Sequence, residues 1–131
     1  MIFLVNDWKL LFFVLNFVAH YVMDNPRIVQ LKQFLEKDPH DAFSRYALAL
    51  EYANAGLLKE AQDEFETLLQ IHPTYTATYY HLGKLYEKQG QSAKAKSIYE
   101  QGIELTAQLG QTHANKELRE ALFILTESEN N

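Results

Sequence analysis

The sequence predicts an all-α protein built of antiparallel helix pairs that stack on one another. Three observations support this prediction. The chain of 131 residues repeats itself at an interval of 34 residues. Within each repeat, apolar residues recur at helical spacing. The whole chain has only three prolines and five glycines, too few for the many tight turns of an all-β fold.

The internal repeat gives two full units, residues 42–75 and 76–109. Large, small and turn-forming residues keep the same phase in both units, which a chance match of one or two positions would not do. The matched pairs are Tyr46 and Tyr80, Leu48 and Leu82, Ala49 and Gly83, Tyr52 and Tyr86, Gly56 and Gly90, Ala61 and Ala95, Phe65 and Tyr99, and Leu69 and Ile103.

Each unit is predicted to hold two helices. In the first unit, one helix is expected over Ala42–Asn54 and the other from about Leu58 to Ile71, because apolar residues line one stripe of each segment. Gly56 is expected to end the first helix, since glycine adopts the left-handed conformation that closes a helix at little cost. Pro73 marks the next boundary. The second unit repeats this arrangement.

The segments on either side of the two units are also predicted to be helical. Leu31, Leu35 and Pro39 stand one interval before their counterparts in the first unit, so a half unit is expected over 25–38. Residues 111–127 are expected to form a capping helix with one polar face, which the open end of a helical array requires. Residues 128–131 are expected to fray.

The run Leu48-Ala49-x-x-Tyr52, Gly56, Ala61-x-x-x-Phe65 and its repeat in the second unit resemble the tetratricopeptide repeat. The resemblance covers about residues 25–109 and implies a right-handed superhelix that binds proteins. Two departures stand out. Arg45 and Tyr79 replace the family's early tryptophan. Ala107 replaces the closing proline of the second unit, so that helix is expected to run on toward Gly110.

The first helix of each unit has a second stripe, on the side that the resemblance places in a concave groove. We expect this groove to bind a peptide or helix, with Tyr46 and Tyr80 as anchors, because rigid aromatic side chains dominate such interfaces. In a competing interpretation, the stripe of the first unit is covered by the 25–37 helix or by the N-terminal segment. The groove residues are Phe43, Tyr46, Leu50, Ala77, Tyr80, Lys84, Glu87 and Lys88.

Composition argues against several other functions. The net charge of −5 and the absence of a basic cluster make nucleic acid an unexpected partner. No cysteine is present, and the five histidines form no i, i+3 or i, i+4 pair, so neither a metal nor another cofactor is expected. No motif of an activated nucleophile or phosphate loop occurs. We therefore expect a non-catalytic adaptor, with self-association into a homo-oligomer as the alternative.

Residues 1–22 differ from the rest, since 17 of them are apolar and only Asp7 and Lys9 are charged. The stretch without charge is too short for an ordinary membrane span. Three interpretations remain open: an extension upstream of a start at Met23, a poor membrane anchor or export signal, or a helix packed on the repeats. The first predicts a cytoplasmic protein, and the second a membrane-tethered assembly factor or an exported protein.

Overall fold

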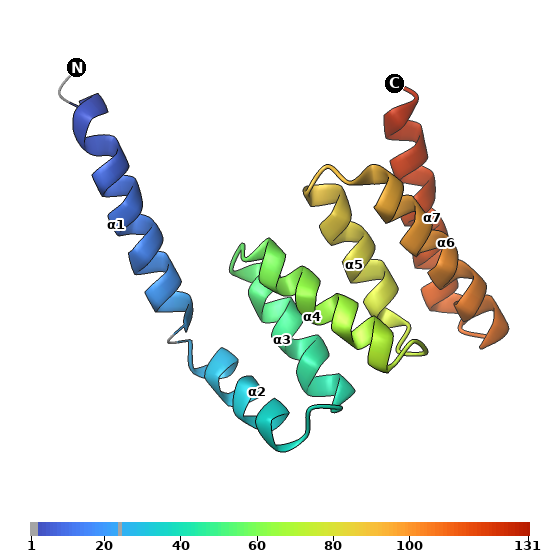
Figure 1. Ribbon diagram of the computed structural model, residues 1–131. Helices are drawn as coiled ribbons and strands as arrows, with labels where there is room; N and C mark the ends of the chain where they lie inside the picture. Colours follow the sequence, from blue (N-terminus) through green and yellow to red (C-terminus); the bar gives the residue numbers. More distant parts are fainter. Residues whose placement is uncertain (1–2, 24) are drawn as a thin grey trace.

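The computed structural model describes residues 3–23 and 25–131, and within these residues it contains helices and no strand (Figure 1). The prediction of an all-α fold is confirmed. The helices are α1 (Phe3–Met23), α2 (Pro26–Lys37), α3 (Ala42–Asn54), α4 (Leu58–Ile71), α5 (Ala77–Lys88), α6 (Ser92–Gln108) and α7 (Thr112–Glu129).

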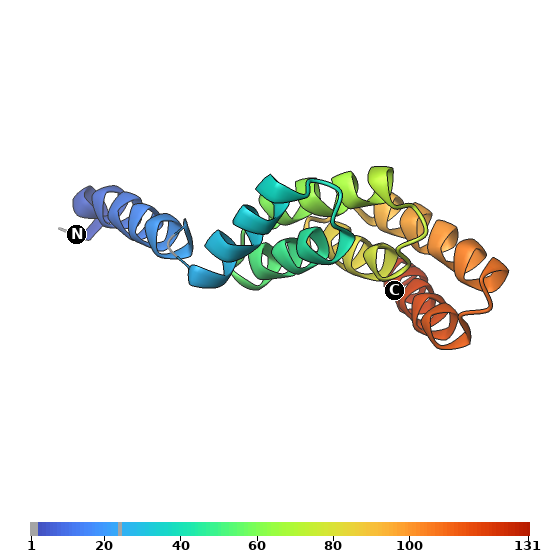
Figure 2. The ribbon, with the colours of Figure 1, turned by 90° about the horizontal axis from the view of Figure 1, so that it is seen from below.

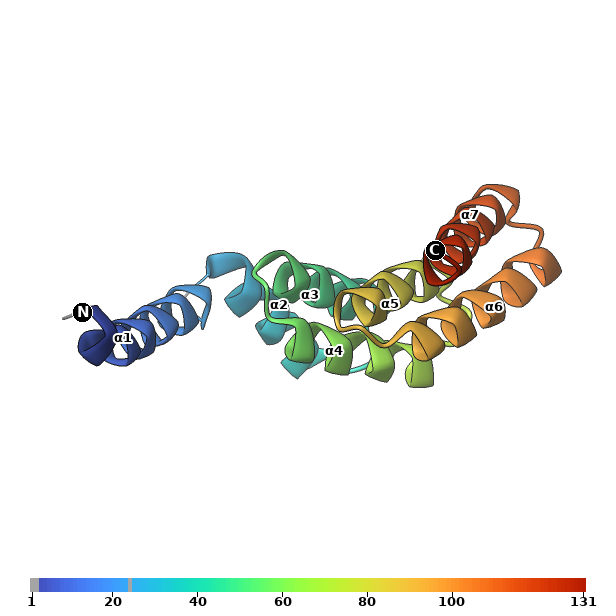
Figure 3. The same cartoon turned by 90° about the horizontal axis from the view of Figure 1, so that it is seen from above.

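Six of these helices form a curved array of two layers. Figure 3 shows α3, α5 and α7 along one side and α2, α4 and α6 along the other. Each helix of one layer packs against its neighbours in the other, so the stack grows by one helix pair at a time. α1 projects from the α2 end of the array and touches little besides α2 (Figure 2).

Glycines with positive φ close the hairpins. Gly56 has a φ of 78° and Gly90 a φ of 71°, values that a side chain with a Cβ rarely adopts. The left-handed residue lets the next backbone N–H reach back into the helix: the amide of Leu57 donates to the Tyr52 carbonyl at 2.9 Å. This hydrogen bond satisfies a carbonyl that the helix end would otherwise leave open.

The core alternates large and small side chains between the two layers. Tyr99 and Phe65 are the largest fully buried side chains. A Cβ added to Gly83 would lie 2.1 Å from the Tyr99 ring, so only glycine lets α5 and α6 come this close. The hydroxyl of Tyr86 donates to Glu66 of α4 at 2.7 Å and thereby joins one unit to the next.

The two departures from the family pattern each have a structural replacement. Arg45 lies half-buried between α3 and α4, where it donates to Glu64 at 2.5 Å and to the Pro39 carbonyl at 2.8 Å. In the second unit the Tyr79 hydroxyl donates to the Pro73 carbonyl at 2.7 Å. In each unit, a hydrogen bond from the first helix to the loop before it thus holds the start of that helix in place.

The structure corrects two expectations and confirms one. Ser128 and Glu129 belong to α7, so fraying does not begin at residue 128. The expectation that the last helix of the second unit runs past Ala107 toward Gly110 is confirmed, because α6 ends at Gln108 and Gly110 follows its cap with a φ of 67°. The interpretation of residues 1–22 as a helix packed on the repeats is wrong for the described part, because residues 7–18 are exposed along α1. Residues 1 and 2 of that segment lie outside the described part.

None of the helices in the described ranges combines the length and the apolar character that a crossing of the bilayer demands.

Candidate functional site

The predicted groove residues belong to α3 and α5, two helices of the layer that also includes α7 (Figure 3). Their neighbours on the same helices point the other way and are buried: Leu48 is 2% exposed, and Leu82 is fully covered. The groove residues are less covered than these core residues, although Tyr46, Leu50 and Tyr80 also pack against the core.

On α3 the groove residues differ in how far they are covered. Phe43 is 69% exposed, and neither α1 nor α2 covers it, contrary to the competing interpretation of an internal cover. Leu50 and Ala53 are half-buried against the core. Phe43 is therefore the apolar side chain of this stretch with the most area left for a partner.

Tyr46 is half-buried and belongs to the floor of the groove rather than to its rim. Its ring lies 6.1 Å from Phe65 of α4, 5.3 Å from Tyr75 in the α4–α5 loop and 5.6 Å from His81 of α5, measured between ring centres. Burial raises the pKa of Tyr46, and the nearby Tyr75 adds to the rise. Tyr46 thus joins the two units as well as facing the groove.

His81 occupies the centre of this aromatic cluster. Its ring stacks on Phe65 at 6.1 Å with an angle of 8° between the planes, and it meets the Tyr80 ring edge-on at 5.4 Å. Burial lowers the pKa of His81, while the charge of Glu117 on α7 acts in the opposite direction. The neutral imidazole is the form that this site favours.

Two of the charges predicted for α5 form an ion pair. Lys84 lies 3.1 Å from Glu87, one helical turn away. Glu87 also accepts a hydrogen bond from the buried Tyr99 hydroxyl, so its position is fixed from behind. Lys88 is exposed, whereas Ala77 and Tyr80 are half-buried. The middle of the groove is polar, with its carboxylate held in place.

The groove face continues onto α7, which the sequence did not predict. Leu118 of α7 packs on Gly102 beside Tyr79 and is 1% exposed. Its counterpart in α5, Leu82, is likewise fully buried. α7 therefore stands where the first helix of a third unit would be, and its residues follow their counterparts in α5 by 36 positions instead of 34. α6 has 17 residues and α4 has 14. Because α6 is longer, a comparison at a fixed interval of 34 residues does not align α7 with α5. The apolar spacing of Leu118, Leu122 and Leu125 was the available signal.

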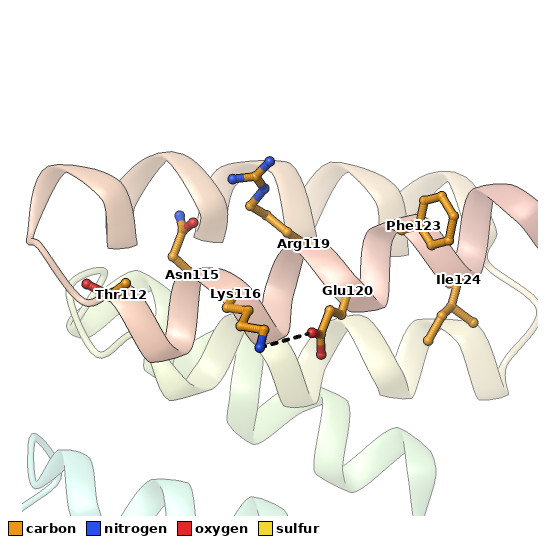
Figure 4. A pocket seen from close by; sticks show the side chains of 7 residues that line it. All are labelled: Thr112, Asn115, Lys116, Arg119, Glu120, Phe123 and Ile124. Carbon is orange, nitrogen blue, oxygen red and sulfur yellow. Dashed lines mark ion pairs between the residues drawn. The ribbon is translucent and has the colours of Figure 1, made fainter.

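An open hollow of about 560 Å³ lies along the outer side of α7. Figure 4 shows Lys116, Glu120 and Ile124 pointing to one side of the helix and Arg119 and Phe123 to the other. Lys116 and Glu120 form a loose ion pair of 3.8 Å. Ile124 and Phe123 are 59% and 64% exposed, so α7 does not have the purely polar face expected of a cap.

The groove combines aromatic, aliphatic and charged side chains. Within the described ranges, no three His, Asp or Glu side chains approach closely enough to hold a metal ion. Lys84 of the groove pairs with Glu87 on its own helix. Aromatic and aliphatic side chains beside such pairs offer area and hydrogen bonds, which are the means of recognising a peptide.

Comparisons with known proteins agree with this fold. A family model described as tetratricopeptide repeat matches residues 52–122. A TPR repeat-containing protein of Pseudomonas aeruginosa is 31% identical over 88 residues, which cover 67% of this chain and 84% of the relative.

Solved structures show the same likeness. A tetratricopeptide repeat domain protein of Salinibacter ruber, solved in solution, is 39% identical with a TM-score of 0.67 and covers 72% of this chain and 95% of that one. The TPR2B domain of yeast Sti1, solved in a complex with pHsp70, has a TM-score of 0.73 over 85% of this chain and 91% of that one. Its identity of 12% shows a shared fold alone.

Proposed function

Because this chain belongs to the tetratricopeptide repeat family, we propose that it is a non-catalytic adaptor that binds a peptide or helix of another protein in the groove along α3, α5 and α7. Repeats of this family are scaffolds for contacts between proteins. The TPR2B domain of yeast Sti1 has been solved in a complex with pHsp70, which supports another protein as the partner. A cytoplasmic location stays a prediction.

One observation carries the proposal: Phe43 is 69% exposed beside a floor of half-buried aromatic rings. A large aromatic side chain left in water next to an apolar floor is typical of the centre of a binding site. We propose that Phe43 and Tyr80 contact apolar side chains of the partner and that Lys84 and Lys88 contact its polar groups.

The test compares variants of the groove with matched variants elsewhere on the full chain. Phe43→Ser and Lys84→Glu are expected to weaken the binding of a captured partner about tenfold or more, since each removes a central contact. Leu109→Ser and Lys96→Glu make the same changes at exposed positions outside the groove and are expected to leave affinity unchanged. Isothermal titration calorimetry gives the affinities.

Equal affinity for Phe43→Ser and Leu109→Ser would contradict the groove as the binding site. Tyr46→Ala is a poor test, because the loss of three ring contacts would disturb the junction between the units.

A further inference from the structure

α1 leaves far more apolar surface in water than a stable monomer usually does. Nine large apolar side chains between Trp8 and Val18 are 42–68% exposed. At about 150 Å² for a large apolar side chain, they present roughly 800 Å² of apolar surface. The largest apolar patch of a typical monomer is about 300–600 Å², and one side of a standard protein interface buries about 800 Å².

The sequence of α1 is in phase with the first helices of the two units. Moving back 34 residues from Leu48, Ala49 and Tyr52 gives Val14, Leu15 and Val18, all apolar. The same step from the groove positions Phe43 and Leu50 gives the polar residues Lys9 and Asn16, whereas the step from Tyr46 gives Phe12. α1 thus has an apolar stripe where a first helix meets its partner, and on the groove side it has a narrow polar stripe, Lys9 and Asn16, beside Phe12.

The place that such a helix would occupy, against α2 and α3, is empty in the described chain. Phe34 of α2 stands one interval before Leu68, which is fully buried, yet Phe34 is 45% exposed. Gly83 faces the large Tyr99 in the second unit, and the corresponding pair here is Leu15 and Leu31. Leu31 is already only 7% exposed, so Leu15 would complete its cover.

The connection between α1 and α2 opposes closure within one chain. Val22 stands one interval before Gly56, and a β-branched residue is a severe outlier in the left-handed conformation that the hairpin needs. Only two residues separate α1 from α2, whereas three separate α3 from α4 and three separate α5 from α6. α1 accordingly points away from its own α2 (Figure 1).

We propose that α1 of one copy fills the empty first-helix place against α2 and α3 of a second copy, and that the exchange is reciprocal in a twofold dimer. The exposed apolar surface of α1 is about as large as the surface that one side of such an interface buries. A lipid surface is the less suitable cover, because interfacial helices carry a broad face rich in Lys and Arg. The polar stripe of α1 is narrow and has Lys9 alone as a cation of that kind. The proposal does not rest on the groove as a binding site.

The absence of cysteine from the chain allows a clean cross-linking test. Arg45 and Glu64 form the ion pair between the two helices of the first unit, and Leu11 and Gln30 stand one interval before them. A mixture of full-length Leu11→Cys and Gln30→Cys proteins is therefore expected to give a disulfide-linked heterodimer on mild oxidation. Neither protein alone should cross-link to a comparable extent.

Light scattering across concentrations supplies the second measurement. The wild-type chain is expected to pass from monomer to dimer. Val14→Asp is expected to raise the dissociation constant at least about tenfold, since it puts a charge into the new core. Phe123→Asp, at the exposed far end, should have no effect. The circular dichroism of Val14→Asp should show the array intact.

Four results would overturn the proposal. The first two are a monomer at every concentration and a Leu11→Cys protein that cross-links to itself, which means that two α1 helices pair. The other two are an intramolecular disulfide in a monomeric Leu11→Cys/Gln30→Cys double variant and sedimentation of the chain with phosphatidylcholine vesicles in place of dimerisation.

Discussion

Gly83 shows how one residue sets the distance between two helices. Its missing side chain lets the Tyr99 ring lie across α5, and Tyr99 in turn holds Glu87 from behind through its hydroxyl. Burial, together with the adjacent Glu87 carboxylate, raises the pKa of Tyr99 far above its usual value, so the hydroxyl stays a donor at any ordinary pH. A single small residue thus serves both the packing of the second unit and the geometry of the groove.

Gly83→Leu is expected to lower the free energy of unfolding by about 2–3 kcal/mol, because the added side chain would overlap the Tyr99 ring and force the helices apart. Ala93→Leu, at an exposed position of α6, is the control and should change stability little. Urea denaturation of both variants gives the comparison. A Gly83→Leu protein as stable as Ala93→Leu would contradict the close approach of α5 and α6.

At the scale of elements, the junction between the two units depends on a histidine that favours the neutral state. The His81 ring is packed among Phe65, Tyr46 and Tyr80. Protonation would place a charge in this aromatic cluster, with the Glu117 carboxylate as the compensating charge. The junction should therefore weaken when the medium becomes acidic.

The expected pH dependence follows from linkage. The folded-state pKa of His81 lies below the ordinary value of 6.5, so its contribution to stability is complete above pH 6.5 and is lost as the pH falls toward and past the lowered pKa. Wild type should lose more stability than His81→Phe between pH 7.5 and pH 5.5, because the other histidines contribute equally to both proteins. Denaturant titrations at the two pH values measure the difference, and parallel losses would count against the assignment.

The helices of the two units could be predicted closely, since α3 and α4 have the expected bounds. Periodic apolar residues, a cap glycine and a boundary proline act locally, so the sequence alone reveals them. The role of α7 could not be predicted, because a helix of altered length moved its stripe out of phase. Tyr46 was placed in the groove, but its three ring contacts come from elements far along the chain, which no local pattern shows.

At the scale of the whole molecule, stability should decline from the middle of the array to its ends. Each helix pair contacts only its neighbours, so α4 and α5 are covered from both directions, whereas α2 and α7 are covered from one. Opening of an end pair breaks one interface, and opening of the centre breaks two.

Hydrogen exchange should follow this order. Amides of α4 and α5 are expected to exchange slowest, those of α2 and α7 faster, and those of α1 fastest in dilute solution, because α1 has almost no cover of its own. Mass spectrometry of exchanged peptides can measure the rates at low protein concentration. Equal protection from α2 to α7 would mean that the array opens as a single cooperative unit, contrary to this prediction.

The shared position of Tyr46 constrains any redesign of ligand preference. Its ring is committed to Phe65, Tyr75 and His81, so a library that randomises it would return many unfolded chains. Randomisation is better confined to Phe43, Lys84 and Lys88, because these side chains can be replaced without disturbing the junction between the units. A new specificity would then be selected on an unchanged scaffold.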